Sequence, residues 1–158
     1  MPDFESILGR LLKHRVEFVL IGGYAAIVHG SPLVTQDMDI CCRFSATNLL
    51  RLQKAVADLH PVHRMTPQRL PLRLTRRNCR GLKNLYVSTD WGVLDCLGAV
   101  AGLGDYREVL RQSEQLDLGF GICRLLTLDA LIESKKALDR PRDRESLRVL
   151  KAIAEQRR

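Results

Sequence analysis

Two aspartates, Asp37 and Asp39, stand one residue apart inside the otherwise apolar run DMDICC. Side chains alternate between the two faces of a strand, so both carboxylates should project from one face while Met38 points into the core. Burying an unpartnered carboxylate costs free energy or forces it to take up a proton, and two side by side also repel each other. The pattern therefore predicts a positive partner at this face, and Mg²⁺ or Mn²⁺ is the cation that such oxygen ligands favour.

A third acid of the same kind is Asp95, in the apolar run GVLDCL. Asp90 lies nearby, but the stretch STDWG places it in the turn of a hairpin. Three aspartates on adjacent strands of one sheet can hold two divalent ions ~3.5–4 Å apart, which is the arrangement that clamps both oxygens in phosphoryl transfer. The alternative is structural, with ion pairs between these acids and the chain's many arginines. The sequence favours the metal site and leaves the ion pairs open.

Two adjacent glycines, Gly22 and Gly23, separate the β-rich run EFVLI from the short alanine-rich segment YAAIVHG. Glycine lets the backbone approach a ligand closely, and backbone N–H groups at the start of a helix can bind phosphate. A glycine pair by itself is more often a tight turn. Because this pair precedes the strand that carries the two aspartates, it indicates a site for the phosphates of a nucleotide.

The formal net charge of +7 indicates an anionic partner. Its distribution is uneven, since no acidic residue lies between Asp58 and Asp90. We call residues 64–83 the basic segment, because they contain Arg64, Arg69, Arg73, Arg76, Arg77, Arg80 and Lys83. The pattern is consistent both with a solvated loop and with a surface that holds a phosphate backbone or a nucleoside triphosphate.

The composition is that of a soluble globular protein, with 46% hydrophobic and 27% charged residues in a chain of 158. No apolar run approaches the ~18 residues that can span a bilayer. The N-terminal stretch MPDFESILGR lacks the basic-then-apolar order of a signal peptide, so we expect a cytoplasmic protein without a membrane partner. The cysteines lack CxxC spacing, and reduced, buried thiols are expected in the apolar runs that contain Cys41, Cys42, Cys96 and Cys123.

Apolar spacing and capping residues predict helices at 3–15, 24–30, 45–60 and 104–115, and two more in the tail 127–158, joined at DRPRD. β-Rich runs predict strands at 17–21, 37–44 and 118–127, an edge strand at 71–75, and a hairpin at 82–100 that turns at TDWG. This order predicts an α/β (α+β) chain with a small mixed β-sheet flanked by helices. We expect a single domain over 1–158, with its core at about 1–126 and a C-terminal helical hairpin at about 127–158.

These motifs together resemble those of the nucleotidyltransferase superfamily with the DNA polymerase β-like fold. The resemblance rests on the glycine pair, on HGSPLVTQDMDI and on the lone aspartate of GVLDCL. The tail LLTLDALIESKKALDRPRDRESLRVL is similar to the L-x-x-L-I-x-x-K … R-P-K-D ending of the small bacterial AbiEii/MenT-type nucleotidyltransferase group. The resemblance extends from about residue 16 to residue 152 and implies the polymerase β-like fold.

The resemblance also implies a role for each matched position. Binding of Mg²⁺ or Mn²⁺ and catalysis are implied for Asp37, Asp39 and Asp95, the last also as a candidate acceptor of the proton from an attacking hydroxyl. Contact with the nucleotide is implied for Gly22, Gly23, Thr35 and Lys135. In the family pattern, Arg140 and Asp143 accompany that lysine.

The implied activity is a Mg²⁺-dependent transfer of a nucleoside monophosphate from an NTP to an acceptor hydroxyl, with release of pyrophosphate. In the narrower group the acceptor would be tRNA, reached through the basic segment, and the enzyme would be a toxin with an antitoxin partner. One departure is Leu33, at a position where members of the group often carry arginine. The alternative is therefore a non-catalytic nucleotide- or RNA-binding module that retains the fold.

Overall fold

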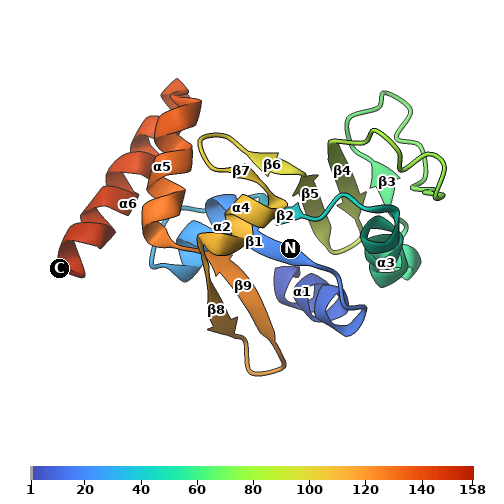
Figure 1. The fold of residues 1–158 in the computed structure, drawn as a ribbon, viewed down its shortest axis with the longest axis horizontal. Helices are drawn as coiled ribbons and strands as arrows, with labels where there is room; N and C mark the ends of the chain where they lie inside the picture. The colour runs from blue at the N-terminus through green and yellow to red at the C-terminus, as the bar shows by residue number, and fades with distance from the viewer. Residues whose placement is uncertain (1) are drawn as a thin grey trace.

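A seven-stranded mixed sheet forms the centre of the computed structural model, which describes residues 2–158 (Figure 1). Its strand order is β3-β4-β5-β2-β1-β9-β8. The strands are β1 Phe18–Ile21, β2 Asp37–Cys42, β3 Val62–His63, β4 Asn84–Thr89, β5 Gly92–Leu97, β8 Ser113–Asp117 and β9 Ile122–Leu126. A separate two-stranded sheet consists of β6 Ala99–Val100 and β7 Gly104–Asp105. The predicted mixed sheet is confirmed.

The helices flank this sheet and begin close to the positions that the sequence predicts. They are α1 Phe4–Lys13, α2 Gly22–Val28, α3 Ala46–Val56, α4 Tyr106–Arg111, α5 Leu128–Leu138 and α6 Arg144–Gln156. Short 3₁₀ turns follow α3 at Ala57–Leu59 and precede α6 at Pro141–Asp143. Side-chain oxygens accept a backbone N–H of the first turn at the N-caps Asp3, Ser45 and Thr127.

The two ends of the molecule are built from different parts of the chain (Figure 1). At one end α5 and α6 pack against each other as the predicted C-terminal helical hairpin. At the other end lie α3, β3 and the loops of the basic segment. In this view the β6–β7 hairpin lies between the two ends, next to the middle strands of the sheet.

The strands β1 and β2 lie at the centre of the hydrophobic core. All four residues of β1 are buried, because β1 is a central strand between β2 and β9 and helices α2 and α4 pack against it. In β2 the alternation is clear: Met38 and Ile40 are 0% exposed, whereas Asp37 and Asp39 are only partly buried. The two acids therefore leave the core on one face, as their spacing predicts.

One predicted helix is too long, and one predicted edge strand is almost absent. The helix predicted at 104–115 ends at Arg111, because residues 113–117 form β8 and pair antiparallel with β9 along their whole length. Sheet pairing outweighs the weak helical periodicity of that exposed segment. The edge strand predicted at 71–75 is reduced to an isolated bridge between Pro71 and Val62. Proline has no N–H with which to extend a ladder.

The state of the cysteines agrees with the prediction of buried, reduced thiols. All five cysteines lie within the described residues and are buried and free. Over residues 2–158, none of the helices combines the length and the apolar character that crossing a membrane requires.

Candidate active site

One cavity of about 680 Å³ is lined by every residue that the sequence predicts as a site residue. Its volume is in the range of roughly 300–1,000 Å³ that is typical of ligand sites. The predicted residues in its lining are Gly22, Gly23, Thr35, Asp37, Asp39, Asp95 and Lys135. The side chains of Arg64, Tyr86, Arg140 and Asp143 line it as well. The cavity thus joins residues from the middle of the sheet to residues from both ends of the molecule.

The strand register brings the aspartates together. Asp39 on β2 pairs with Asp95 on β5, and on its other side with Ile21, the residue before Gly22. Adjacent strands lie about 4.8 Å apart, so these two carboxylates are neighbours. Asp37 precedes Asp39 by two positions on the same strand and shares its face. Three negative charges therefore converge on one wall of the cavity.

Burial and the neighbouring negative charges change the pKa of Asp39. Burial, followed by the charges of Asp95 and Asp37, raises the pKa of Asp39 to about 6 from an ordinary value of 3.8. The positive charges of Lys135 and Arg64 act in the opposite direction without cancelling the effect. The ionised form of Asp39 thus lacks sufficient positive charge around it, and an added cation would stabilise it.

Asp95 has a partner, Arg64, which follows β3 directly. Arg64 Nη2 donates a hydrogen bond of 2.6 Å to Asp95 Oδ2, and the side chain of Asp95 is only 10% exposed. The second oxygen, Asp95 Oδ1, is buried and accepts no hydrogen bond. Burial raises the pKa of Asp95, while the bond from Arg64 acts against this. The ion pair that the sequence left open is therefore realised at this aspartate.

The donor set suits a hard divalent cation only in part. Oxygen ligands are those that Mg²⁺ and Mn²⁺ prefer. Across the described residues 2–158, however, no three His, Cys, Asp or Glu side chains are grouped closely enough to hold a metal ion as they stand. Asp95 already uses one oxygen for Arg64. Asp37 and Asp39 fit as ligands of one ion, with phosphate oxygens and water as the other ligands, which is how Mg²⁺ is usually bound.

The glycine pair is in direct contact with this cluster. Gly22 has φ +69°, a left-handed conformation that favours glycine, and a Cβ there would lie 2.4 Å from Asp39 Oδ2. At Gly23 a Cβ would lie 3.0 Å from Thr35 Oγ1, which donates a hydrogen bond of 2.9 Å to the carbonyl of Asp37. Both glycines therefore leave room for the chain that enters β2, and the backbone at Gly22 runs beside a candidate metal ligand.

Asp143 organises the basic wall of the cavity. Arg140 Nε donates to Asp143 Oδ2 at 2.6 Å, and Lys135 Nζ donates to Oδ1 at 3.1 Å. The side chain of Asp143 is 6% exposed. The hydrogen bond from Arg140, and then that from Lys135, lower its pKa to about 2. Two cations around one carboxylate give this cluster a net positive charge, and phosphate is an anion that such a charge can bind.

We expect Asp143→Asn to lower the free energy of unfolding by about 2 kcal/mol at pH 7. The pKa of Asp143 is lower in the folded protein than in the unfolded chain, so its stabilisation is present above pH ~4 and is lost as pH falls toward 2. Denaturant unfolding at pH 7 and pH 3 measures this, and the difference between the two proteins should shrink at pH 3. Asp129→Asn, an exposed site on α5, is the control. An equal difference at both pH values would contradict the assignment.

Arg64 is the site residue that the sequence did not single out. It is one of several arginines in the basic segment, and composition treats them alike. What distinguishes it is strand pairing: its N–H donates to the carbonyl of Tyr86, and Tyr86 on β4 pairs with Asp95 on β5. The β4–β5 hairpin was predicted, but β3 has only two residues and no recognisable pattern, so this register could not be derived from the sequence.

The sequence matches no protein-family model and no curated protein. Solved structures match it at the level of the fold. ANT(2″)-Ia, crystallised in complex with adenylyl-2″-tobramycin, is 15% identical, with a TM-score of 0.58 over 93% of this chain and 84% of that chain. TM1012, a candidate nucleotidyltransferase from Thermotoga maritima, is 15% identical, with a TM-score of 0.60 over 96% of this chain and 91% of that chain. The chain therefore has the fold that these two solved structures share. The narrower resemblance to the AbiEii/MenT-type group stays a prediction.

Proposed function

We propose that the protein is a nucleotidyltransferase that moves a nucleoside monophosphate from an NTP to an acceptor hydroxyl and releases pyrophosphate. The observation that carries this proposal is the composition of a single cavity, which is lined both by three carboxylates and by a net positive cluster around Asp143. Carboxylates suit a divalent cation, and the basic cluster suits phosphate. Fold similarity to two nucleotidyltransferases supports the same activity.

The nucleotide would lie in this cavity, in contact with both groups of side chains. Asp37 and Asp39 would hold Mg²⁺ or Mn²⁺, and the ion when bound supplies charge that offsets the phosphates and polarises the α-phosphoryl group. Lys135 and Arg140 line the same cavity and would contact the outgoing phosphates. The close backbone at Gly22 would bring its neighbouring N–H groups to the triphosphate.

The acceptor hydroxyl would react beside Asp95. Its oxygen forms a bond to the α-phosphorus, the bond from that phosphorus to the pyrophosphate oxygen breaks, and pyrophosphate leaves with the electron pair. The hydroxyl proton passes to the carboxylate of Asp95, which lines the cavity. A base with a raised pKa holds such a proton better than an ordinary aspartate, and burial acts on Asp95 in that direction.

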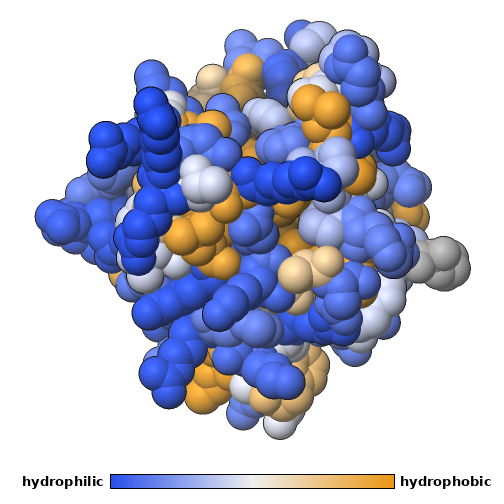
Figure 2. Space-filling model, turned by 90° about the vertical axis from the view of Figure 1, so that its right-hand side faces the viewer, coloured by the Kyte–Doolittle hydropathy of each residue, from blue (hydrophilic) through white to orange (hydrophobic). Residues whose placement is uncertain are grey.

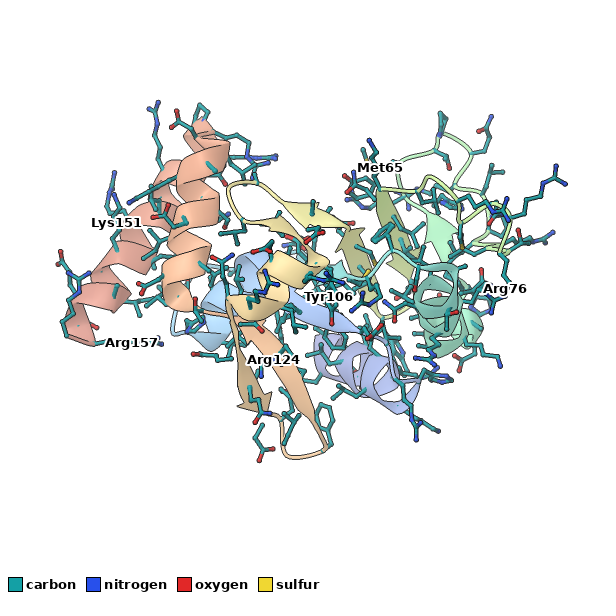
Figure 3. The ribbon with its side chains drawn as sticks, in the orientation of Figure 1. Met65, Arg76, Tyr106, Arg124, Lys151 and Arg157 are labelled. Atoms are coloured by element: carbon teal, nitrogen blue, oxygen red, sulfur yellow. The ribbon has the colours of Figure 1, made fainter. Side chains whose placement is uncertain are left out.

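Charge on the two ends of the molecule favours a polyanionic acceptor. Residues 59–89 contain seven Lys or Arg and no Asp or Glu, and residues 135–158 contain nine against four. The rest of the chain has nine against fourteen. These basic stretches lie at opposite ends in Figure 1, and each contributes to the cavity lining, through Arg64 and through Lys135. Figure 3 shows Arg76 at one end and Lys151 at the other, both directed outward.

The surface at the basic segment is largely hydrophilic, as a site for a charged acceptor requires. Figure 2 faces that end, where hydrophilic residues cover most of the surface and apolar residues form separate patches. The basic stretches would repel a cationic amino sugar, such as the tobramycin part of the adenylyl-2″-tobramycin in the ANT(2″)-Ia complex. We therefore propose RNA as the acceptor, with a terminal ribose hydroxyl as the nucleophile and tRNA as the first substrate to test.

The activity is tested with NTPs labelled at either the α- or the γ-phosphate, incubated with Mg²⁺ and total RNA. Label from the α-phosphate should enter RNA, while label from the γ-phosphate should appear in pyrophosphate. Asp37→Ala should abolish both signals, and Asp129→Asn should leave them unchanged. Transfer that survives Asp37→Ala would exclude the assignment.

Binding of RNA is tested separately. We expect the double variant Arg73→Glu/Arg77→Glu to weaken binding of a single-stranded RNA at least tenfold in 0.1 M salt, because both side chains are exposed on the basic segment. The slope of log K against log salt should decrease by about 1.4, or about 0.7 for each phosphate that the variant no longer neutralises. Fluorescence anisotropy measures both quantities. Lys13→Glu on α1 is the control, and equally weakened binding in the two variants would contradict a localised RNA surface.

The toxin role is a further proposal that rests on the resemblance alone. Growth arrest on expression should require Asp39 and should be relieved by a partner encoded beside the gene. Arrest that persists in Asp39→Asn would contradict an enzymatic toxin.

A non-catalytic module is the second candidate, favoured by the Arg64–Asp95 ion pair and by Leu33. Isothermal titration that shows nucleotide binding, with no label transferred to any acceptor in total cell extract, would establish it instead.

A further inference from the structure

Arg64 stands at the end of a row of residues that crosses the sheet. Its backbone N–H donates to the Tyr86 carbonyl at 3.0 Å, Tyr86 pairs with Asp95, and Asp95 pairs with Asp39. The guanidinium lies over the Tyr86 ring, 5.5 Å from its centroid, and binds Asp95 on the next strand. Strand pairing and an aromatic ring therefore direct this arginine at the carboxylates, in contrast to the exposed arginines of the same segment.

Arg64 and Asp95 make only part of the contact that they can form. The Nε and Nη2 groups share one edge of the guanidinium and can bind both oxygens of a carboxylate. Here Nη2 binds Oδ2, whereas Nε and Oδ1 are both buried without a hydrogen-bond partner. A buried polar atom without a partner costs about 1–3 kcal/mol, so such atoms are rare and call for an explanation.

We propose that Arg64 is a positioning residue that takes the place of a second divalent ion: it holds Asp95 through Oδ2 and offsets the negative charge of that carboxylate. This inference rests on the proposed function. It makes the site a one-ion site, with the ion at Asp37 and Asp39.

Three observations support this assignment. Asp95 is directly paired with Asp39 in the register, which is where a second ion would lie between two carboxylates. The guanidinium is permanently charged, so it offsets Asp95 whether or not nucleotide is bound. In the described part of the chain, no three acids are grouped closely enough to hold an ion. This is expected if one of them, Asp95, is already paired with an arginine.

The test counts Mn²⁺ ions by titration followed by electron paramagnetic resonance of the free ion, in wild type, Arg64→Gln, Arg64→Lys and Arg76→Gln. Wild type should bind one ion per chain. Arg64→Gln should bind a second ion, because Asp39 and Asp95 then face each other without a cation. Arg64→Lys keeps the charge and should bind one ion, as should Arg76→Gln, which removes an exposed arginine of the same segment.

Two ions in wild type, or one ion of unchanged affinity in Arg64→Gln, would overturn this inference. The wild-type count needs no variant, so a misfolded Arg64→Gln would leave the first of these outcomes decisive. If α-label is transferred while wild type binds two ions, the proposed function stands and only the role of Arg64 is wrong. If wild type binds no ion and transfers no label, both proposals are wrong.

Discussion

Asp39→Asn is expected to make the metal-free protein more stable and at the same time to reduce nucleotidyl transfer strongly. The pKa of Asp39 is raised to about 6 in the folded protein, chiefly by burial and then by Asp95 and Asp37. An acid whose pKa is higher in the folded than in the unfolded chain lowers stability as pH rises from ~4 to ~6. Asparagine has no charge to bury, so it removes this cost.

The gain in unfolding free energy should be about 2 kcal/mol at pH 7.5, a value reduced to allow for the partly exposed side chain. Below pH ~4 the two proteins should be equally stable. Transfer should fall about a thousandfold, equivalent to about 4 kcal/mol of transition-state stabilisation, because a ligand of the cation is removed. Denaturant unfolding in EDTA and the α-label assay measure the two effects.

Asp129→Asn is the control for both effects and should change neither by much. A variant Asp39→Asn that is less stable than wild type at pH 7.5 would mean that the carboxylate is already well paired in the metal-free protein. Unchanged transfer would remove Asp39 from the active site.

Gly22→Ala should have the second-largest effect. The φ angle of Gly22 is +69°, and the added Cβ would meet Asp39 Oδ2 at 2.4 Å and Asp39 Cβ at 2.9 Å. Backbone strain of about 1–2 kcal/mol adds to this contact, and we expect a total loss of about 3 kcal/mol in unfolding free energy. The carboxylate must also move, so affinity for Mn²⁺ and the rate of transfer should both fall at least tenfold.

Gly119→Ala separates strain from steric overlap. Gly119 has φ +88°, but a Cβ there meets nothing within 4 Å. The control should be destabilised only by the strain, about 1–2 kcal/mol, and should keep wild-type Mn²⁺ affinity. Equal Mn²⁺ affinity in Gly22→Ala and wild type would show that the close approach to Asp39 has no functional consequence.

Local sequence patterns predicted most of the fold because they act over a few residues. The alternation in DMDICC places Met38 and Ile40 in the core and both aspartates outside it, and the structure has this arrangement. The caps at Ser45 and Thr127 likewise depend on neighbouring backbone groups. The spacing of the acids was enough to indicate a shared face, and the cavity brings all predicted site residues together.

The failures concern pairings between distant segments. Residues 113–117 form a strand because β9 lies beside them, and nothing in their own sequence requires it. The contact of Arg64 with Asp95 spans three strands and depends on a two-residue β3. The role of Asp143 was indicated only by a resemblance, whereas its two cations and its lowered pKa are consequences of how α5 meets the turn before α6.

The central claim is that these carboxylates bind a divalent cation next to the triphosphate of a nucleotide. It is tested most directly by a crystal grown with Mn²⁺ and a non-hydrolysable NTP analogue, measured at a wavelength where manganese scatters anomalously. We expect one anomalous peak in contact with Asp37 and Asp39, with the triphosphate between this peak and Lys135 and with Arg64 still bound to Asp95. An analogue bound in the cavity without a peak at the carboxylates, or a peak elsewhere in the molecule, would contradict the claim.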